Sequence, residues 1–525
     1  MRASDVLPAR FNAAAHFVDR NVAEGRGASP AFVCEGRTLT YADVLALANR
    51  TGNALRGLGV EASDRVVMIC LDAPEFLGTF WGAIKIGAVP VPVNTLMRAA
   101  DYRHVLNDSR ARVVVVSAPL LDEAAPALGD GAHVRHVLVA GTAGSFLSWE
   151  AHVEKASATL EAAATSRDDP AFWLYSSGST GSPKGAVHLQ HDMFVCAETY
   201  AKQVLGIRPS DRVFSAAKLF FAYGLGNAGY FPLSVGAHSV LHAPRPTPEA
   251  VFEVIARHHP TLFFGVPTLY AGMLAVKDAE RRYDTSSLRL CVSAGEALPA
   301  EMYGRWLERF GVEIIDGMGT TELLHMCLSN RPGAVRPGSS GLPVPGYDAT
   351  IVDDAGDPVA RGEIGSLRVR GDSVMAAYWN QPEKTRQTLH GEWLITGDKY
   401  YQDEDGFFWY CGRSDDMLKV GGRWVSPVEV EATLIAHPAV LESAVVGHEA
   451  EDGLVKAKAF VVLKDPAEAS AALAAELQAF VKAKIAPYKA PRWVEFVDGL
   501  PKTATGKIQR FRLRRPVTGP RQPPS

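Results

Sequence analysis

Short apolar runs that alternate with helix-patterned segments constrain the fold of this chain more than any other feature. Runs such as ARVVVVSA, TLFFGV and LRLCVSA are bounded by turn residues and separated by segments whose apolar residues recur at helical spacing. Strands that are apolar on both faces are typical of parallel sheets covered by helices on both sides. We therefore predict an α/β fold whose large N-terminal domain consists of doubly wound sheets.

Size and charge exclude several other classes of protein. The chain has 525 residues, of which 47% are hydrophobic and 21% charged, so it is not disordered, collagenous or coiled coil as a whole. Its 54 basic and 58 acidic side chains give a net charge of −4, which offers no electrostatic case for a nucleic-acid partner. The segment 76–93 is apolar but is interrupted by Lys85, Pro90 and Pro92, so we expect a buried helix and a strand there, and no membrane partner.

The cysteines and the N-terminus indicate a cytoplasmic protein. No CxxC or zinc spacing links the cysteines, and a chain of this size needs no disulfide framework. The N-terminal segment MRASDVLPARFNAAAHFVDR lacks the continuous apolar core of a signal peptide. We therefore expect reduced, buried thiols at Cys34, Cys70, Cys196, Cys291, Cys327 and Cys411.

Near Gly341 the sequence pattern changes from alternating strands and helices to strand pairs joined by short turns. Two hairpins are expected, with turns at residues 354–356 and 404–406, and they would form a β-barrel-like subdomain. The following SDDMLKVGGR is interpreted as a linker or loop, and Ser426-Pro-Val-Glu429 as a helix start. We predict an N-terminal domain at 1–413, a hinge at 414–416, a small mobile α+β lid domain at 417–515 and a disordered tail at 516–525.

A loop rich in glycine and hydroxyl side chains carries the strongest chemical signal. The segment Tyr175-Ser-Ser-Gly-Ser-Thr-Gly-Ser-Pro-Lys-Gly185 lies between the apolar strands AFWLYS and GAVHLQ. Glycines let backbone N–H groups approach an anion, hydroxyls add donors, and Lys184 adds a positive charge, which together suit a triphosphate. The spacing is not that of a Walker A loop, so a kinase or GTPase reading has no support. A plain flexible hairpin loop is the alternative.

A second glycine motif allows a competing interpretation. Gly224-Leu-Gly-Asn-Ala-Gly229 matches GxGxxG, which would favour an NAD-dependent oxidoreductase. Pro232, however, falls where the following helix should begin and would be expected to break it. We therefore prefer glycines that pack beside a pocket. The pairs His188/His191 and His258/His259 are interpreted as surface or core histidines rather than as ligands.

Five motifs in order make the chain resemble the acyl-adenylate-forming enzymes, a family that includes acyl-CoA synthetases, adenylation domains and luciferases. These motifs are YSSGSTGSPKG, Asp316-Gly-Met-Gly-Thr-Thr-Glu322, Thr396-Gly-Asp398, Gly412-Arg-Ser-Asp-Asp416 and Pro501-Lys-Thr-Ala-Thr-Gly-Lys507. The resemblance implies ATP, Mg²⁺ and CoA, and a lid that rotates between two half-reactions about the hinge residue Asp415. Gly421 and Gly422 would face the CoA channel.

The resemblance also implies a role for each motif residue. Lys507 would bridge the carboxylate and the α-phosphate, and Glu322 would hold Mg²⁺; with Thr180 they form the expected catalytic set. ATP would be bound by Ser176, Ser177, Gly178, Ser179, Thr180, Gly181, Lys184, Gly295, Glu296, Asp316, Gly317, Met318, Gly319, Thr320, Thr321, Asp398, Arg413 and Lys507. Plainer alternatives stay open: Lys507 as one more cation in a basic segment, Asp398 as a turn residue, and Glu322 as an exposed acid.

The expected acid is aromatic. The pocket would be lined by Phe221, Ala222, Tyr223, Gly224, Ala294, Gly317, Gly319, Leu324 and His325. KLFFAYGLGN and TTELLHMCLSNRPG resemble the benzoate-CoA ligase branch, which handles benzoate, 2-aminobenzoate and 4-hydroxybenzoate. Aromatic side chains beside glycines suggest a flat slot for a ring. His325 could contact a ring substituent or could be a satisfied pocket histidine.

The sequence thus predicts an ATP-dependent aryl-CoA ligase that releases AMP and diphosphate. An enzyme that loads a carrier protein is the nearest alternative, and an NAD-dependent oxidoreductase or a non-catalytic nucleotide sensor are more remote. Ten basic and two acidic residues between Lys482 and Arg515 form either a solvated basic face or a surface facing phosphates. A homodimer is considered.

Overall fold

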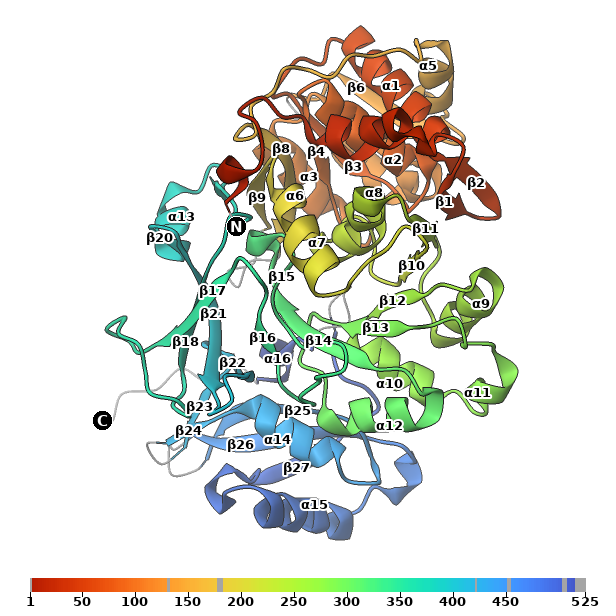
Figure 1. The fold of residues 1–525 in the computed structure, drawn as a ribbon. Helices are drawn as coiled ribbons and strands as arrows, with labels where there is room; N and C mark the ends of the chain where they lie inside the picture. The colour runs from red at the N-terminus through yellow and green to blue at the C-terminus, as the bar shows by residue number, and fades with distance from the viewer. Residues whose placement is uncertain are drawn as a thin grey trace, which may run out of the picture.

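The computed structural model describes residues 2–129, 133–176, 183–420, 423–450, 455–502 and 508–514 (Figure 1). Its largest sheet has the strand order β16-β15-β14-β13-β12-β10-β11-β1-β2, and the strands from β14 to β1 are all parallel. The strands are β1 (Pro30–Cys34), β2 (Arg37–Thr40), β10 (Arg212–Ser215), β11 (His238–Leu241), β12 (Leu262–Gly265), β13 (Leu290–Ser293), β14 (Ile314–Gly319), β15 (Met326–Ser329) and β16 (Leu342–Pro343).

A second, fully parallel sheet has the order β4-β3-β5-β6-β7. Its strands are β3 (Arg65–Ile69), β4 (Val89–Pro92), β5 (Val113–Ser117), β6 (His136–Ala140) and β7 (Leu147–Ser148). β5 is buried along its whole length, as its run of valines predicts. The two sheets confirm the expected doubly wound α/β architecture.

Helices cover the two parallel sheets. They are α1 (Tyr41–Gly57), α2 (Pro74–Lys85), α3 (Ala99–Ser109), α4 (Leu121–Leu128), α5 (Trp149–Lys155), α9 (Pro248–His258), α10 (Pro267–Ala275), α11 (Ala279–Arg282) and α12 (Ala300–Phe310). Thr40 caps α1 through a capping box with Asp43, and Pro74 opens α2. Helices α1 and α2 pack so closely that a Cβ on Gly82 would lie 2.8 Å from the Ala48 carbonyl oxygen.

The glycine-rich loop joins two strands of a small antiparallel sheet with the order β19-β9-β8. These strands are β8 (Pro170–Ser176), β9 (Lys184–Leu189) and β19 (Ala377–Tyr378). The helical elements α6 (Asp192–Cys196) and η5 (Ala197–Ala201) follow β9 along the chain. The two predicted strands on either side of the loop are therefore confirmed, and they pair antiparallel. Residues 177–182 of the loop itself lie outside the described part of the chain.

The GxGxxG segment lies inside a helix rather than on a strand-to-helix turn. The helical path runs through α7 (Ala222–Gly224), the π-helical η6 (Leu225–Tyr230) and α8 (Phe231–Val235). The expectation that Pro232 would break the helix is wrong. The Phe231 N–H donates to the Gly226 carbonyl, five residues back, and this wider turn accommodates the proline that follows it.

Two further units complete the chain. The first is an antiparallel sheet with the strand order β17-β18-β21-β20, in which β22 also pairs with β21. Its strands are β17 (Asp348–Val352), β18 (Gly365–Arg370), β20 (Leu389–His390), β21 (Trp393–Gln402) and β22 (Phe408–Arg413), and α13 (Pro382–Thr388) lies beside them. Both predicted hairpins, β17–β18 and β21–β22, are present. The C-terminal unit contains β23 (Leu418–Val420), β24 (Arg423–Val425), α14 (Pro427–Ile435), β25 (Val440–Glu449), β26 (Val455–Leu463), α15 (Ala471–Lys484), β27 (Trp493–Phe496) and α16 (Arg510–Leu513).

The C-terminal unit is an α+β domain with its own hydrophobic cluster, which includes Leu418, Val430 and Val481. The segment interpreted as a linker or loop instead forms the antiparallel hairpin β23–β24, which corrects that interpretation. Ser426 caps α14 as predicted, by accepting a hydrogen bond from the Glu429 N–H. The domain boundaries at 413 and 417 remain predictions, and the predicted tail at 516–525 lies outside the described residues.

The remaining elements are short 3₁₀ or π-helical turns: η1 (Ala3–Asp5), η2 (Ala15–Asp19), η3 (Val22–Arg26), η4 (Ala118–Leu120), η7 (Thr321–Leu323), η8 (Pro466–Glu468) and η9 (Pro487–Lys489). All six cysteines are buried and free. Over the described ranges, no helix combines the length and apolar character needed to cross a bilayer.

Candidate active site

The candidate site lies where neighbouring parallel strands of the large sheet end. The segment 294–296 follows β13, the motif from Asp316 begins within β14, and the segment 218–224 follows β10. Because β10, β12, β13 and β14 are parallel neighbours, their carboxyl ends open on the same edge. That edge is where open α/β sheets bind ligands. The topology therefore brings the predicted adenine and acyl segments together.

Glu322 lies at the centre of a polar cluster. Its Oε1 accepts a hydrogen bond of 2.6 Å from the Tyr378 hydroxyl and lies 3.3 Å from the Lys184 Nζ. The Ser176 hydroxyl is 3.4 Å from the same oxygen, and Lys184 also donates to the Tyr378 hydroxyl. The two ends of the glycine-rich loop, Ser176 and Lys184, thus meet the carboxylate of the Asp316–Glu322 motif.

The charges of this cluster stabilise each other. Burial lowers the pKa of Lys184, although the Glu322 carboxylate opposes that shift. Burial pushes the pKa of Glu322 upward, but Lys184 and the Tyr378 hydroxyl outweigh it, so the net pKa lies below its usual value. Glu322 is therefore ionised at neutral pH. Over the described residues no group of three His, Cys, Asp or Glu side chains is placed to hold a metal.

The predicted adenine residues surround the ends of β13 and β14. Asp316 is buried and its Oδ2 accepts a hydrogen bond from the Leu298 N–H, while burial raises its pKa to about 8. Gly295 has a φ of +95°, a conformation that suits glycine. Glu296 accepts a hydrogen bond of 2.9 Å from the Ile508 N–H. The C-terminal domain therefore reaches the nucleotide edge with the residue that directly follows Lys507.

The predicted ribose residues are adjacent on β21 and β22. Asp398 and Arg413 are opposite each other in the two strands, with the Arg413 Nη1 3.3 Å from the Asp398 Oδ1. The Arg413 guanidinium also donates to the Thr396 carbonyl. Burial opposes the charge of Arg413, but Asp398 outweighs it and raises its pKa.

The predicted hinge residue follows directly. The Asp415 carboxylate is exposed, and its Oδ1 lies 3.8 Å from the Arg413 Nε. The Asp415 carbonyl accepts a hydrogen bond from Arg514, which also pairs with Asp416. The predicted hinge residue therefore contacts both Arg413 and the C-terminal segment.

Several cations of the basic C-terminal segment pair within their own domain. Lys489 binds Glu429, Lys502 binds Glu442, and Arg510 binds Glu431 at 2.6 Å. These three cations thus pair with carboxylates of α14 and β25 within the C-terminal domain. Of the segment's remaining cations, Lys507 lies outside the described residues.

The predicted acyl residues surround His325. The imidazole is buried, and its ring centroid lies 4.6 Å from Phe231, 5.1 Å from Tyr200 and 5.7 Å from Tyr223. The Nε2 is 3.0 Å from the Asn227 Oδ1. Burial lowers the pKa of His325 to about 3, so the ring is neutral. Because the Asn227 Oδ1 can only accept, Nε2 carries the proton of the neutral ring, and Nδ1 is the nitrogen that can accept a hydrogen bond.

Close backbone contacts shape this pocket. A Cβ on Gly224 would lie 2.1 Å from the Lys218 carbonyl oxygen, and one on Gly319 would lie 2.5 Å from the His325 carbonyl oxygen. Leu324 is buried with a φ of +67°, an uncommon conformation for a residue with a Cβ. The strained turn places Glu322 and His325 on different sides of the same short segment.

The structure describes most, but not all, of the predicted site. Phe221, Ala222 and Tyr223 pack against the main core, and Tyr223 donates to the Gly265 and Val292 carbonyls. The other predicted positions directly follow β13 or lie on β14 and the turn after it: Ala294, Gly317, Met318, Gly319, Thr320, Thr321 and Leu324. Outside the described residues are Ser177, Gly178, Ser179, Thr180, Gly181, Gly421, Gly422 and Lys507.

The sequence analysis missed residues that the structure brings into the site. Tyr378 contacts both Glu322 and Lys184, and Asn227, Gly226, Tyr200 and Phe231 surround His325. Only Asn227 and Gly226 carried a signal, since they belong to the segment KLFFAYGLGN, which the resemblance places beside the acyl pocket. Tyr378 lies on a two-residue strand that no local pattern marks.

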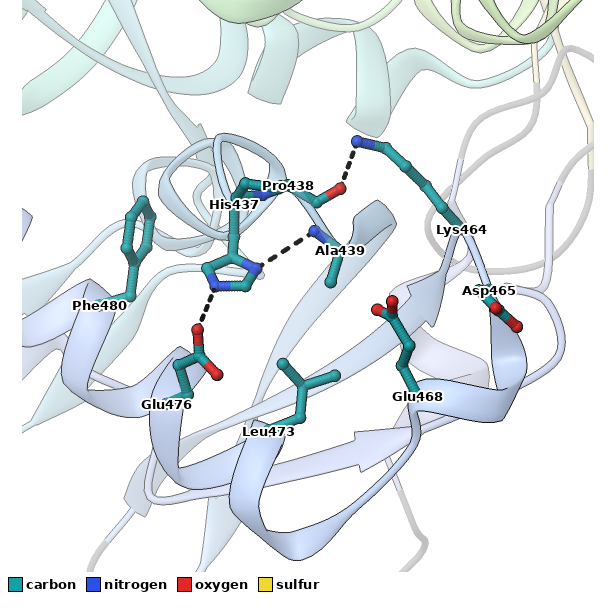
Figure 2. Close-up of a pocket in the computed structure, with 9 residues that line it drawn as sticks. All are labelled: His437, Pro438, Ala439, Lys464, Asp465, Glu468, Leu473, Glu476 and Phe480. Atoms are coloured by element: carbon teal, nitrogen blue, oxygen red, sulfur yellow. Dashed lines mark hydrogen bonds and ion pairs between the residues drawn. The ribbon is translucent and has the colours of Figure 1, made fainter.

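A hollow of about 800 Å³ lies in the C-terminal domain and does not belong to this site (Figure 2). His437 borders it with both ring nitrogens engaged, one by Glu476 and one by the Ala439 N–H. Phe480 and Leu473 line it together with Asp465 and Glu468. Among the predicted nucleotide and acyl residues that the structure describes, none lines it.

The fold and site define a nucleotide-dependent enzyme with a large α/β domain and a separate C-terminal α+β domain. Residues 19–379 match the AMP-binding enzyme family, and residues 429–507 match the AMP-binding enzyme C-terminal domain. The chain belongs to the AMP-binding enzyme family.

Full-length relatives agree with this assignment. The chain is 54% identical over 510 residues to a benzoate–CoA ligase of Thauera aromatica, covering 97% of this chain and 96% of the relative. The crystal structure of an anthranilate CoA ligase in complex with anthranoyl-AMP is 47% identical, with a TM-score of 0.94 and coverage of 98% of both chains. A benzoate CoA ligase from Burkholderia xenovorans LB400 is 48% identical, with a TM-score of 0.90 and coverage of 96% of this chain and 100% of that chain.

Proposed function

We propose that this protein is an ATP-dependent aryl-CoA ligase that activates benzoate or a substituted benzoate such as 2-aminobenzoate. An acyl-adenylate forms first with release of diphosphate, and CoA then displaces AMP to give the aryl-CoA thioester. The observation that carries this proposal is the turn from Glu322 to His325. It presents a carboxylate to Lys184 on one side and an imidazole to an aromatic pocket on the other.

The chemistry of the first step explains why such a cluster is needed. Joining a carboxylate to ATP brings two anions together, and unit like charges 4 Å apart repel by about 4 kcal/mol at an effective dielectric near 20. Lys184 supplies a fixed cation near the phosphates, and Lys507 would supply the second over the reacting carboxylate and α-phosphate. The contact between Ile508 and Glu296 supports this role for Lys507, because it joins the neighbouring backbone to the nucleotide edge.

Mg²⁺ fits the residues that are present. The cation keeps several waters and is commonly bound by one or two carboxylates plus substrate phosphates. Glu322 is ionised and is the carboxylate that the phosphate-loop residues approach, so it would hold Mg²⁺ against the phosphates. Asp398 would accept the ribose hydroxyls with Arg413 beside it, while Gly295, Glu296 and Asp316 would line the adenine.

The ring of the acid would lie against Tyr223 and His325. Because the imidazole is neutral and its Nε2 is committed to Asn227, its Nδ1 can accept a hydrogen bond but cannot pair with an anionic group. Over the described residues, this Nδ1 and the Asn227 Nδ2 have no hydrogen-bond partner. The pocket therefore favours a ring that is unsubstituted or carries an uncharged donor such as an amino group.

CoA is proposed as the thiol, with Gly421 and Gly422 facing its channel and Asp415 as the hinge. We also propose a cytoplasmic location, since the six buried free thiols are typical of a reducing compartment, and a homodimer as the assembly to be tested.

The test is a product assay with benzoate and 2-aminobenzoate, each with ATP, Mg²⁺ and CoA. AMP and the aryl-CoA thioester should form in equal amounts. Formation of ADP would contradict the proposal. Acid-dependent diphosphate release without a CoA thioester would instead favour a carrier-protein-loading enzyme, and hydride transfer to NAD would favour the oxidoreductase.

A further inference from the structure

The turn that carries Glu322 is held by three successive backbone carbonyls, each of which accepts a hydrogen bond from outside the turn. The His188 Nε2 lies 2.8 Å from the Thr321 oxygen, the Met375 N–H donates to the Glu322 oxygen at 2.8 Å, and the Ser373 hydroxyl donates to the Leu323 oxygen at 2.7 Å. Met375 contributes a backbone group, and Ser373 is shared with Tyr347. His188 is thus the only histidine among these three donors.

We propose that His188 is a positioning residue for Glu322 in the adenylation half-reaction, an inference that rests on the proposed function. His188 does not touch the nucleotide residues themselves. It acts on the backbone one residue before Glu322, and so it sets where the carboxylate meets Lys184. A shift of the carboxylate by a fraction of an ångström would weaken this contact, because catalytic groups must be held closely to their productive geometry.

The surroundings of His188 fix the ring in one orientation. The side chain is fully buried, stacks on Phe172 with a centroid distance of 5.3 Å, and lies with its Nδ1 2.7 Å from the Asp192 Oδ2. The same Asp192 oxygen accepts a hydrogen bond from the Leu189 N–H. A carbonyl can only accept, so the contact with Thr321 requires a proton on Nε2. The Asp192 carboxylate holds the other ring nitrogen, Nδ1. A contact of this kind commonly fixes the orientation of the ring and so which atom its Nε2 contacts.

Strand β9 therefore contacts the Glu322 turn at two points. Lys184 and His188 are four residues apart on the strand, so their side chains lie on the same face. Lys184 contacts the Glu322 carboxylate and His188 contacts the backbone before it. The strand that ends the phosphate loop thus also fixes the turn that carries the metal-binding carboxylate.

The neighbouring His191 belongs to the same buried network but serves other carbonyls. Its two nitrogens each lie 2.9 Å from a carbonyl oxygen, those of Arg167 and Asp372, and its Nε2 is 3.2 Å from the Asp192 Oδ1. Within the described residues, His191 makes no hydrogen bond to the Glu322 turn. The positioning role is therefore assigned to His188.

Two substitutions of matched polarity separate positioning from general structural support. In His188→Gln the amide nitrogen occupies the place of Nε2 and can still donate to Thr321. In His188→Asn the amide nitrogen occupies the place of Nδ1, keeps the contact with Asp192, and cannot reach Thr321. Each variant is assayed in both half-reactions, with diphosphate release for adenylation and a supplied acyl-adenylate plus CoA for thioester formation. Equilibrium binding of ATP with Mg²⁺ is measured by calorimetry.

For adenylation we expect His188→Asn to lose about tenfold in kcat/KM, the equivalent of one hydrogen bond, and to bind ATP with Mg²⁺ more weakly. His188→Gln should stay within about threefold of the wild type by the same reasoning, and both variants should retain thioester formation. Equal losses in the two half-reactions, or a His188→Gln variant as impaired as His188→Asn, would overturn the proposal.

A measurement on the unsubstituted protein covers the case in which a variant does not fold. With ¹⁵N-labelled histidine, the His188 signal should show a proton on Nε2 that is protected from exchange, and His188→Gln or His191→Gln assigns the signal. An unprotonated Nε2 would refute the hydrogen bond itself. If the wild-type protein formed no AMP with any aromatic acid, the proposed function would fail while this readout would still decide the hydrogen bond.

Discussion

Substituting Gly226 tests the shape of the aromatic pocket directly. A Cβ at this position would lie 2.4 Å from the His325 Cδ2, 2.8 Å from its Nε2 and 3.1 Å from the Tyr230 hydroxyl. An ordinary contact between carbon atoms is about 3.5–4.0 Å, so the imidazole or the helix would have to move by about 1 Å. His325 has little room to move, because it is buried against Tyr200 and Phe231.

The expected cost follows from two opposing effects. Overpacking a core costs about 1–3 kcal/mol, and displacing the imidazole also weakens its hydrogen bond to Asn227, worth about 1 kcal/mol. Replacing a helical glycine by alanine returns about 0.5–1 kcal/mol. We therefore expect Gly226→Ala to destabilise the large domain by about 1–3 kcal/mol on balance.

Gly229 offers a matched control in the same π-helical segment. A Cβ there would lie 3.4 Å from the Leu225 Cδ1, which is an ordinary contact. Gly229→Ala should therefore be neutral or slightly stabilising. Thermal unfolding gives the stability of both variants, and steady-state kinetics with benzoate and 2-aminobenzoate give KM and kcat for each acid.

Gly226→Ala should raise KM for 2-aminobenzoate more than for benzoate, because a displaced His325 reduces the space beside the ring. Its kcat should change less than its KM, since Lys184 and Glu322 are not disturbed. The reasoning would be refuted if Gly226→Ala unfolded at the same temperature as Gly229→Ala and left the KM ratio of the two acids unchanged.

Three further predictions concern other parts of the site. Tyr378→Phe removes the hydroxyl that binds Glu322 and Lys184, and should lower kcat/KM for adenylation about 5- to 30-fold while thioester formation from a supplied acyl-adenylate continues. Lys507→Ala should abolish adenylation and spare the same second half-reaction; equal losses in both would contradict its role. Burial raises the pKa of Asp316 to about 8, whereas in an unfolded chain it is about 4. Between about pH 4 and pH 8 the folded protein therefore binds about one more proton than the unfolded chain, so its stability should fall as the pH rises through this range. Asp316→Asn should flatten that fall, as measured by unfolding temperatures at pH 5 and pH 8.

Local patterns were sufficient where the physical cause is local. Thr40, Pro74 and Ser426 mark helix starts because capping and proline at the first turn act within four residues. The buried strands were equally predictable, because a short continuous apolar run bounded by turns is typical of a strand in the core. These features predicted the parallel sheets and the two strands that flank the glycine-rich loop.

Contacts between distant segments could not be predicted in the same way. Tyr378 reaches Glu322 across 56 positions of sequence, and its strand of two residues is recognisable only through its pairing with β9. The hairpin β23–β24 was missed because its segment was interpreted as a linker, although Gly421-Gly422 between two short apolar runs is a hairpin signal, and Leu418 and Val425 belong to the core of the C-terminal domain. Pro232 was misjudged because the rule that proline ends a helix assumes bonds to the fourth residue back, and the π-helical turn changes that spacing.

The turn after β14 explains why the phosphate end and the ring end of the site are coupled. Glu322 and His325 are separated by Leu323 and Leu324, both fully buried, and the positive φ of Leu324 costs on the order of 1–3 kcal/mol. Such a conformation persists only when its surroundings determine it, and here the carbonyls of the turn are held by donors from β9 and from the segment 373–375. A rigid turn of this kind sets the distance between the carboxylate and the imidazole. The backbone therefore fixes the distance between the nucleotide and the pocket for the aromatic ring. An acid whose carboxylate is separated from its ring by an extra methylene would place that carboxylate outside the position from which it can attack the nucleotide.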